Sequence, residues 1–405
     1  MKKILHATIF VLSLILLIYA CSSDDDMWDS IIPETQDDPT QDQNNTYVFQ
    51  PAVVDATAER VSQLNLPDGF SIHKFAEDLG EARIIEISES GRIYVSLRGE
   101  GQVLLLEDTN GDWTADRRET VATLENAHGL KIHENKLYIV TIKEIYAADM
   151  NTDGTLGEPQ LLTSGLPDGG QHPNRTIGFG PDGMMYVTIG STCNACVEPN
   201  ELNATMVRAN ADGSNMQVYA EGLRNTIGFG WHPETGVLWG MDHGIDMLGD
   251  EEQSEELNQL SEGEHYGWPH IYDDGQYNPN PRPEDMTYAE FASMSKFPEL
   301  LYTAHAAPME MEFYTGSQFP AAYLGDAFMA FRGSWNRRNP MGYKVCRIIF
   351  ENGLPVRIED FLTGFLVNDN KAHFGRLVGL AQHPDGSLFL TDDTNGVMYN
   401  ITYQE

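Results

Sequence analysis

One histidine in a glycine-rich loop is the residue of this chain best placed to do chemistry. His172 lies in the polar segment 165–175, directly before two short apolar segments (176–180 and 185–189) that are joined by Pro-Asp-Gly. This pattern predicts two strands around a tight turn, and rigid strands hold a loop side chain still. Because imidazole exchanges protons near neutral pH, the loop displays a reactive group at the mouth of a β scaffold.

Cationic side chains recur in equivalent places. Each of five segments carries a His or an Arg, often beside a Gly, just before a predicted strand. They are Ala127-His128-Gly129-Leu130, 171–175 with His172, 222–226 with Arg224 and Asn225, 304–308 with His305, and 374–377 with Arg376. The chain has 25 basic and 61 acidic residues. Such a concentration of scarce cations predicts a cationic, imidazole-lined pocket that binds an anionic ligand.

The elements that position these residues form a repeat of strand, turn and strand. Copies occur at 87–97, 132–142, 179–189, 231–241 and 382–392, with a looser copy at 319–331. A turn glycine or asparagine stands at positions 91, 135, 183, 236, 325 and 386. A period of about 45 residues is typical of β-propeller blades. A sandwich would explain the turns but not the period, so we expect an all-β, six-bladed β-propeller with long inter-blade insertions.

The amino-acid composition limits the classes of binding partner that fit this protein. The formal net charge of −36 argues against nucleic acid or an anionic membrane face as a partner. A soluble, solvated surface is the simplest explanation of the excess carboxylate. The chain contains 37 glycines, and long apolar stretches of helical period are scarce, which favours β structure with many turns.

The N-terminus has the pattern of an export signal. Two lysines precede an apolar run and Ala20-Cys21, which predicts a signal peptide over 1–20 and resembles a bacterial lipobox. Cys21 would then carry lipid. An ordinary secretory signal is the alternative. The acidic start of the polar tether over 21–50 resembles the export tag of surface lipoproteins. We therefore expect an outer-membrane lipoprotein with a lipid anchor to the membrane, at the cell surface or facing the periplasm, with the propeller over 51–405.

The remaining cysteines are few. Cys193 and Cys196 form a C-x-x-C in a chain that carries an export signal, which favours a small disulfide. A zinc half-site would need a second ligand pair, and none is apparent. Cys346 alternates like a strand residue, as a buried free thiol would.

Several motifs in order resemble the soluble, pyrroloquinoline-quinone-dependent aldose sugar dehydrogenases, particularly the sorbosone dehydrogenase-like branch. The resemblance covers about residues 60–403. Its motifs are H-P-N-R-T-I-G-F-G-P-D-G (172–183), G-S-T-C-N-A-C (190–196), G-L-R-N-T-I-G-F (222–229), E-L-N…Y-G-W-P (256–269), A-A-P…F-Y-T-G…F-P (306–320), G-S-W-N-R (333–337) and G-R-L-V-G-L-A (375–381).

The resemblance assigns roles. His172 matches the general base that takes the C1 hydroxyl proton of a sugar while C1 gives hydride to the quinone, which yields the lactone. Arg224 and Asn225 match a pair that contacts the quinone, and Arg376 matches an arginine on one of its carboxylates. Gly244 and Ile245 match the residues whose carbonyl groups hold Ca²⁺, and Asp246 could add an acidic ligand.

Other pocket residues are assigned less directly. His128, His305, Arg332, Trp335 and Arg337 are expected around the quinone. Arg332, Trp335 and Arg337 lie in the loop where the glucose dehydrogenase branch has a cofactor lysine. That branch also has an Asp where this chain has Gln171 and a Gln where it has Ala127. These departures concern the tuning of the base and the sugar specificity.

A second metal site is weaker. Carboxylates between Asp108 and Glu119 imitate the spacing of an EF-hand loop, but Trp113 occupies the position where the sharp turn requires glycine. A plain Asn-Gly hairpin turn explains the segment equally well, and the sequence does not decide whether the loop binds calcium.

Three functions fit these observations. The first is a sugar dehydrogenase that uses quinone and Ca²⁺ and passes electrons to an external acceptor, a cytochrome or a quinone pool. The second is a calcium-dependent lactonase, which would need several carboxylates around its metal. The third is a non-catalytic surface propeller that binds glycans or protein partners, and such a scaffold has no use for His172, Arg224, Asn225 and Arg376 together. The sequence leaves the sugar, the electron acceptor and the oligomeric state open.

Overall fold

A computed structural model describes residues 47–404, and this part of the chain is nearly all β. The predictions of a signal peptide, of a lipid on Cys21 and of most of the tether lie outside the described residues. Within 47–404, none of the helices is both long and apolar enough to cross a membrane. The prediction of an all-β fold is confirmed.

Six sheets, each built mainly from consecutive antiparallel strands, account for most of this part of the chain. The first sheet contains β3 (Ala82–Ile87), β4 (Ile93–Leu97), β5 (Gln102–Glu107) and β6 (Arg117–Thr123). The second contains β7 (Gly129–His133), β8 (Lys136–Val140), β9 (Ile145–Asp149) and β10 (Gln160–Thr163). The third contains β11 (Ile177–Phe179), β12 (Met185–Ile189), β13 (Thr205–Ala209) and β14 (Gln217–Glu221), with β18 (Glu264–His265) on its edge.

The other three sheets complete the set. They are β15 (Thr226–Trp231), β16 (Leu238–Asp242), β17 (Glu255–Leu260) and β21 (Leu300–Tyr302); β22 (Pro308–Phe313), β23 (Ala327–Phe331), β24 (Lys344–Glu351) and β25 (Leu354–Leu362); and β28 (Leu377–Gln382), β29 (Leu388–Asp392), β30 (Val397–Tyr403) and β2 (Phe70–Ala76). In the last sheet, β2 pairs with β30, so one sheet joins strands from near the two ends of the described chain. This pairing closes the ring of sheets and leaves no free edge between its ends.

Each repeated segment of the sequence spans the turn between the first two strands of one sheet. All six turn positions that the repeat singled out adopt positive φ, for example 82° at Gly91 and 61° at Asn135. Glycine and asparagine tolerate this left-handed conformation. The turn chemistry of the sequence therefore placed these strand pairs correctly.

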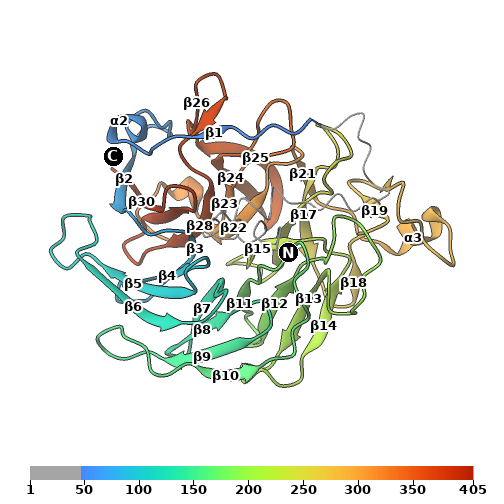
Figure 1. The fold of residues 1–405 in the computed structure, drawn as a ribbon, viewed down its shortest axis with the longest axis horizontal. Helices are drawn as coiled ribbons and strands as arrows, with labels where there is room; N and C mark the ends of the chain where they lie inside the picture. Colours follow the sequence, from blue (N-terminus) through green and yellow to red (C-terminus); the bar gives the residue numbers. More distant parts are fainter. Residues whose placement is uncertain (1–46, 405) are drawn as a thin grey trace, which may run out of the picture. The chain divides into compact units, whose positions relative to one another are not determined.

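The first strands of the six sheets lie side by side around a common centre. Strand β28 packs beside β3, β3 beside β7 and β7 beside β11, while β22 packs between β15 and β28. Figure 1 shows these strands at the middle of the view and β6, β10 and β14 at the periphery. The second strands β4, β12, β16, β23 and β29 are buried along their whole length, because neighbouring sheets cover both of their faces. This is the arrangement of a β-propeller.

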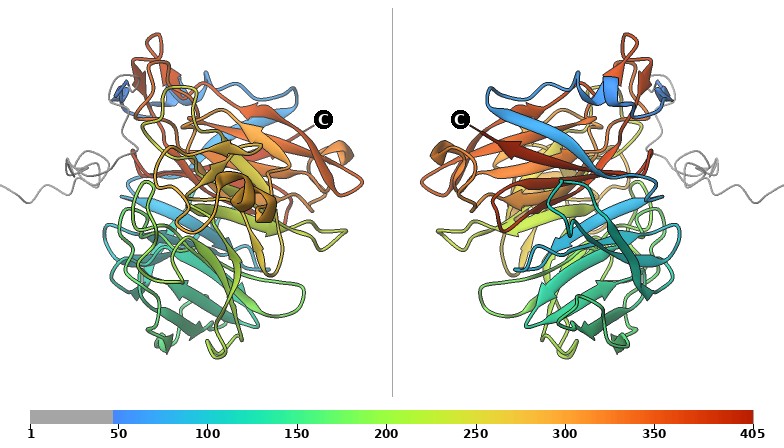
Figure 2. Two further views of the ribbon diagram at one scale, coloured as in Figure 1. Left: turned by 90° about the vertical axis from the view of Figure 1, so that its right-hand side faces the viewer. Right: turned by 90° about the vertical axis from the view of Figure 1, so that its left-hand side faces the viewer.

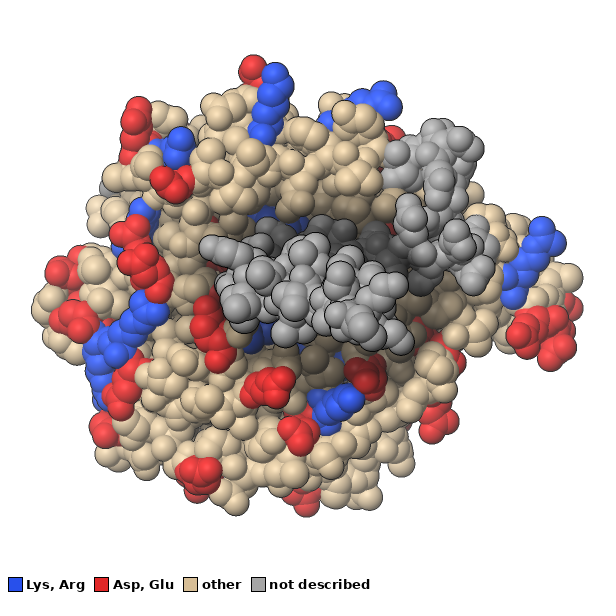
Figure 3. Space-filling model, in the orientation of Figure 1, with Lys and Arg blue, Asp and Glu red and all other residues tan. Residues whose placement is uncertain are grey.

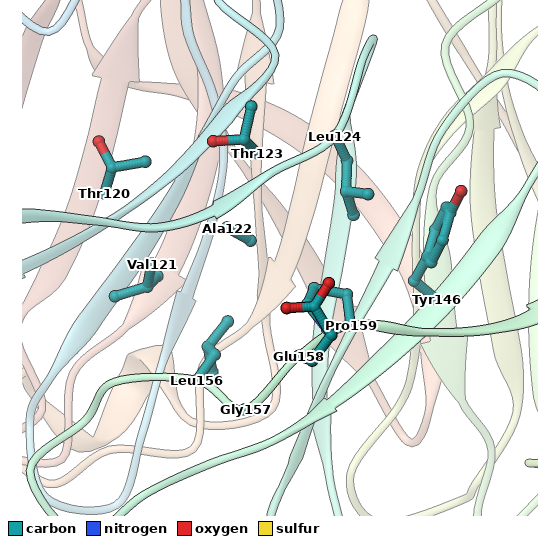
Figure 4. Close-up of a pocket in the computed structure, with 10 residues that line it drawn as sticks. All are labelled: Thr120, Val121, Ala122, Thr123, Leu124, Tyr146, Leu156, Gly157, Glu158 and Pro159. Atoms are coloured by element: carbon teal, nitrogen blue, oxygen red, sulfur yellow. The ribbon is translucent and has the colours of Figure 1, made fainter.

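Smaller elements surround the ring. They are β1 (Ala52–Val53), β26 (Leu366–Val367) and β27 (Ala372–His373) in one sheet, the hairpin β19 (Ile271–Tyr272) and β20 (Gln276–Tyr277), α2 (Ala58–Val61), α3 (Tyr288–Met294) and the 3-10 turn η1 (Ala321–Tyr323). Residues 261–299, with β18 to β20 and α3, separate β17 from β21. Figure 1 shows α3 at the right-hand periphery, and this helix faces the viewer in the left view of Figure 2. A surface furrow between β6 and the segment 156–159 (Figure 4) contains none of the predicted site residues.

Charged side chains also meet on the first strands. Lys131 on β7 forms an ion pair with Glu86 on β3 (2.5 Å), and Glu310 and Glu312 on β22 are close enough to influence both. Burial raises the pKa of Glu312 to about 7, although the Lys131 charge acts in the opposite direction. Glu312 therefore keeps its proton in the folded protein at pH values where an unfolded chain would lose it.

Stability should accordingly fall as pH rises from about 4.5 to about 7, because the folded state binds the proton of Glu312 more tightly than the unfolded state does. Glu312→Gln removes this proton from the balance. We expect the variant to lose roughly 2 kcal/mol less unfolding free energy between pH 5 and pH 8 than the parent protein. Urea unfolding at both pH values measures this, with the exposed Glu89→Gln as control. Parallel pH profiles of parent and Glu312→Gln would contradict the prediction.

Candidate active site

The loops that precede the first strands meet at one end of the ring, and they carry the predicted site residues. His128 precedes β7, His172 precedes β11, Arg224 and Asn225 precede β15, His305 precedes β22 and Arg376 precedes β28. Figure 3 shows a few blue Lys and Arg atoms set back from the surface near the centre of the face in view. The hydrogen bonds of these side chains connect the loops as described below.

His172 is held in one tautomer. Its Nδ1 lies 2.9 Å from the carbonyl oxygen of Ser191 and 2.8 Å from the Ser191 hydroxyl. That hydroxyl donates its one proton to the carbonyl oxygen of Cys193 (2.8 Å), so it accepts from His172. Nδ1 therefore carries the proton, and Nε2 keeps a lone pair that has no hydrogen-bond partner among residues 47–404. A neutral imidazole with an available Nε2 can act as a base.

The surroundings keep His172 neutral. Burial is the largest cause of a pKa well below the ordinary value, and the nearby charge of Arg224 lowers it further. The Ser191 carbonyl acts in the opposite direction without reversing the shift. Gly190 permits this close packing, because a Cβ there would stand 2.6 Å from the His172 Cβ and 2.8 Å from Oδ1 of Asn225.

Arg224 is buried and clamped. Its Nε donates to the carbonyl oxygen of Asn194 (2.9 Å), and its NH2 group donates to Oδ1 of Asn194 (2.8 Å) and to Oδ2 of Asp246 (3.0 Å). Asn336 donates to the other carboxylate oxygen of Asp246 (2.7 Å). Burial opposes ionisation of Asp246, but its contact with His305 and the Arg224 charge more than offset this and lower its pKa. The carboxylate is thus ionised.

A buried aspartate fixes the Arg224-Asn225 turn. Asp242, at the end of β16, accepts from the backbone N–H groups of Arg224 (2.7 Å) and Asn225 (2.8 Å). Asp392, at the end of β29, accepts in the same way from the N–H of Arg376 (2.8 Å). The sequence patterns identified neither residue, although the two occupy equivalent places: Asp392 ends the copy 382–392, and Asp242 directly follows the copy 231–241.

A second group of cationic side chains surrounds Asp393 and Gly333. Arg83 forms an ion pair with Oδ2 of Asp393, and Arg332 donates to the same oxygen (2.8 Å). Arg376 donates to the carbonyl oxygen of Gly333 (3.0 Å). The side chain of Asp393 is fully buried, so one carboxylate is shared by two guanidinium groups. Sequence analysis did not identify Arg83 or Asp393.

Each of the two cationic groups is in contact with a histidine: His128 contacts Arg83, and His305 contacts Asp246. His128 Nδ1 lies 2.9 Å from the carbonyl oxygen of Arg175, and Arg83 Nε lies 3.4 Å from its Nε2. Burial and Arg83 lower its pKa well below the ordinary value. His305 pairs with Asp246 at 3.8 Å, which raises its pKa although burial opposes the charge.

The segment predicted to hold calcium offers carbonyl oxygens. The N–H groups of Gly244, Ile245 and Asp246 donate to Glu255 (2.9 Å), Gln253 (3.0 Å) and Asn194 (2.9 Å) respectively. Within 47–404, no donor hydrogen-bonds to the carbonyl oxygens of Gly244 or Ile245. Unengaged carbonyl oxygens suit Ca²⁺. The carboxylate of Asp246 is instead committed to Arg224 and Asn336.

Two residues of the 332–337 loop have other partners. Arg337 donates to Glu251 (2.6 Å) and to the carbonyl oxygens of Asn339 (2.9 Å) and Ala304 (3.3 Å), so its guanidinium fastens neighbouring loops. The half-buried Trp335 accepts at its carbonyl oxygen from the N–H of Phe49 (3.0 Å). The contact of both residues with a cofactor stays a prediction.

The structure also shows the state of the three cysteines within 47–404 and the hydrogen bonds of the EF-hand-like loop. Cys193 and Cys196 form a disulfide, and Cys346 is free and buried. In the loop that begins at Asp108, the carboxylate accepts from the N–H groups of Gly111 (2.7 Å) and Trp113 (2.7 Å). These bonds stabilise a turn within the loop itself, and the oxygens of Asp108 serve as their acceptors.

The fold and the pocket define a β-propeller-type protein with a neutral base among buried arginines. The chain belongs to the TrAA12-like family, whose model matches residues 64–404. It is 29% identical over 380 residues to an uncharacterised protein of Borreliella burgdorferi, covering 89% of this chain and 96% of that one. It is 23% identical to the pyrroloquinoline quinone-dependent pyranose dehydrogenase of Coprinopsis cinerea, covering 84% of this chain and 54% of that enzyme.

Solved structures share the fold. The calcium structure of Trichoderma reesei Carbohydrate-Active Enzymes Family AA12 matches with a TM-score of 0.74 at 20% identity, over 84% of this chain and 97% of that one. The holo form of the pyranose dehydrogenase PQQ domain of Coprinopsis cinerea matches with a TM-score of 0.71 at 20% identity, over 88% of this chain and all of that one. The TM-scores show that these proteins share the fold of this chain.

The shared carboxylate of Asp393 allows a stability test. Asp393→Asn removes the counter-charge of the buried Arg83 and one partner of Arg332, so we expect the unfolding free energy to fall by about 3 kcal/mol. Asp168→Asn is the control, because Asp168 pairs with Lys143 (3.0 Å) on an exposed surface, where such pairs contribute less than about 1 kcal/mol. Urea unfolding compares them, and equal losses would show that burial of the pair does not matter.

Proposed function

We propose that this protein oxidises an aldose or pyranose sugar at C1 to the lactone, with pyrroloquinoline quinone and Ca²⁺ as cofactors. The observation that carries the proposal is the neutral His172, whose Nε2 is available beside buried arginines. The similarity to the pyrroloquinoline quinone-dependent pyranose dehydrogenase of Coprinopsis cinerea and to the pyrroloquinoline quinone-dependent sugar dehydrogenase of Hypocrea jecorina supports it. We also propose that the six sheets are the blades of a six-bladed propeller with long insertions.

The residues present fit the cofactors. Arg224, Arg332 and Arg376 supply guanidinium groups for the carboxylates of an anionic quinone. Asn225 adds an amide beside His172, and the carbonyl groups of Gly244 and Ile245 supply oxygen ligands for Ca²⁺. The carboxylate of Asp246 accepts hydrogen bonds from Arg224 and Asn336, so its role in this proposal is to position these side chains rather than to coordinate Ca²⁺.

His172 is the catalytic residue of this proposal. Its Nε2 accepts the proton of the sugar C1 hydroxyl, while Nδ1–H stays bound to Ser191 and holds the ring in place. The imidazolium that forms lies near the carboxylate of Asp246, whose charge favours it. When bound, the quinone supplies a two-electron acceptor and Ca²⁺ polarises its carbonyl groups. Electrons then leave to an external acceptor, a cytochrome or a quinone pool.

Reconstitution tests the proposal. The full chain in detergent is incubated with pyrroloquinoline quinone and Ca²⁺, and dye reduction is followed with a panel of aldoses. We expect sugar-dependent reduction that requires both additions. His172→Ala should lower the rate at least about 100-fold, because it removes the base. His73→Ala, an exposed histidine on β2, is the matched control and should retain the parent rate.

Quinone binding without turnover of any sugar in the panel would keep the cofactor assignment and reject these sugars. Failure to bind the quinone would contradict the proposed function. A calcium-dependent lactonase or a surface protein that binds glycans or protein partners would then be the better reading.

We further propose that the chain is an exported lipoprotein of the outer membrane, anchored through Cys21. The support is the sequence pattern of residues 1–26. Cys21→Ser should move the protein from the membrane fraction to the soluble fraction and abolish incorporation of labelled fatty acid. Cys346→Ser, which alters a buried thiol, serves as control. Retention of Cys21→Ser in the membrane fraction would refute the anchor.

A further inference from the structure

The loop 190–196, closed by the Cys193–Cys196 disulfide, contacts both halves of the candidate active site. It runs from the end of β12 past His172 on one side and past Arg224 and Asp246 on the other. We call it the disulfide loop. Neither the fold nor the chemistry of the proposed reaction requires a cross-link here, so its contacts call for an explanation.

One side of the disulfide loop orients the base. The Ser191 carbonyl and hydroxyl oxygens both accept from Nδ1 of His172, and the Ser191 hydroxyl donates to the carbonyl oxygen of Cys193. The position of the Cys193 carbonyl therefore fixes the direction of the Ser191 hydroxyl proton. This leaves Nδ1 as the protonated nitrogen of His172 and Nε2 as the base.

The other side orients the anion clamp. Asn194 accepts from Nε of Arg224 at its carbonyl oxygen (2.9 Å) and from the NH2 group of Arg224 at Oδ1 (2.8 Å). The same Oδ1 accepts from the N–H of Asp246 (2.9 Å), and Nδ2 donates to the carbonyl oxygen of Asp246 (2.9 Å). Asn194 thus fixes Arg224 and Asp246 relative to each other.

The cross-link holds the two sides together. Cys193 supplies the acceptor for Ser191, and Cys193 and Cys196 enclose Asn194 between them. Next to them, Ala195 packs in a small apolar cluster with Ile245 and Trp268. A covalent closure of this short segment reduces the conformations open to Asn194 and to the Cys193 carbonyl.

We propose that the disulfide loop is the positioning element of the site, with Ser191 and Asn194 as positioning residues, so that loss of the cross-link disorders the base and the anion clamp together. The clamp half of this inference rests on the proposed function, because its ligand is the quinone. The base half concerns the orientation of His172 in the protein without cofactor.

The first readout needs no cofactor. Nitrogen-15 spectra of the histidine-labelled full chain report which ring nitrogen of His172 is protonated, and loss of the signal in His172→Ala assigns it. We expect the Nδ1–H form in the parent protein. The double variant Cys193→Ser/Cys196→Ser should show a larger fraction of the Nε2–H form, and Ser191→Ala should change in the same direction by less. Asn194→Ala should leave the tautomer as in the parent.

The second readout is the affinity for pyrroloquinoline quinone, measured by titration of its absorbance in the presence of Ca²⁺. Asn194→Ala removes the Oδ1 acceptor of the buried Arg224 guanidinium, and loss of the cross-link loosens the segment that carries this acceptor, so each variant should weaken binding by about 10-fold or more. Thr192→Val is the matched control. Thr192 lies in the same loop, but its hydroxyl and N–H bond to Glu198 (2.6 Å and 2.9 Å) and to neither half of the site.

The outcomes separate the two proposals. A folded double cysteine variant that keeps the parent tautomer, or that keeps the parent quinone affinity, overturns the positioning role. If the double variant does not fold, the parent protein is reduced with a phosphine in the folded state and measured again. If the parent chain binds no quinone, the proposed function fails, and the tautomer of His172 in the double variant or in the reduced protein alone decides the role of the disulfide loop.

Discussion

Every buried guanidinium in this protein needs an acceptor close at hand, and this need organises the pocket. Burying a charge without partners costs several kcal/mol, so each arginine here has carboxylate or carbonyl oxygens in contact. Arg224 has Asp246 and Asn194, Arg83 and Arg332 share Asp393, and Arg376 has the carbonyl of Gly333. Since each acceptor comes from a different loop, the closed ring of sheets is what brings donor and acceptor together.

The parts of the structure that depend on local sequence were predictable. A turn with positive φ between two apolar segments is encoded within about a dozen residues, and its repetition gave the sheets and the loops that carry His172, Arg224 and Arg376. The partners of these residues were not predictable. Arg83 on β3 and Asp393 after β29 lie 310 positions apart in the chain, and they meet because β3 packs beside β28 and β29 in the closed ring.

Residue type also does not predict which way a side chain points within one loop. Arg332 and Arg337 are equally suited to an anionic ligand by composition, yet Arg332 pairs with the pocket carboxylate of Asp393, whereas Arg337 fastens Glu251 and the carbonyl of Ala304. The same holds for Asp246, which sequence analysis considered as a metal ligand and which the structure places against Arg224 and Asn336. Side-chain direction depends on packing between sheets, which a single sequence does not display.

Charge couples the two halves of the pocket. The positive charge of Arg224 adds to burial in lowering the pKa of His172, so Arg224 weakens the base when no anion compensates its charge. An anionic ligand on Arg224 would compensate that charge, and Coulomb's law then requires the proton affinity of His172 to rise. The base would be strongest when the anion is in place, and the disulfide loop, which contacts both residues, keeps them at the separation on which this coupling depends.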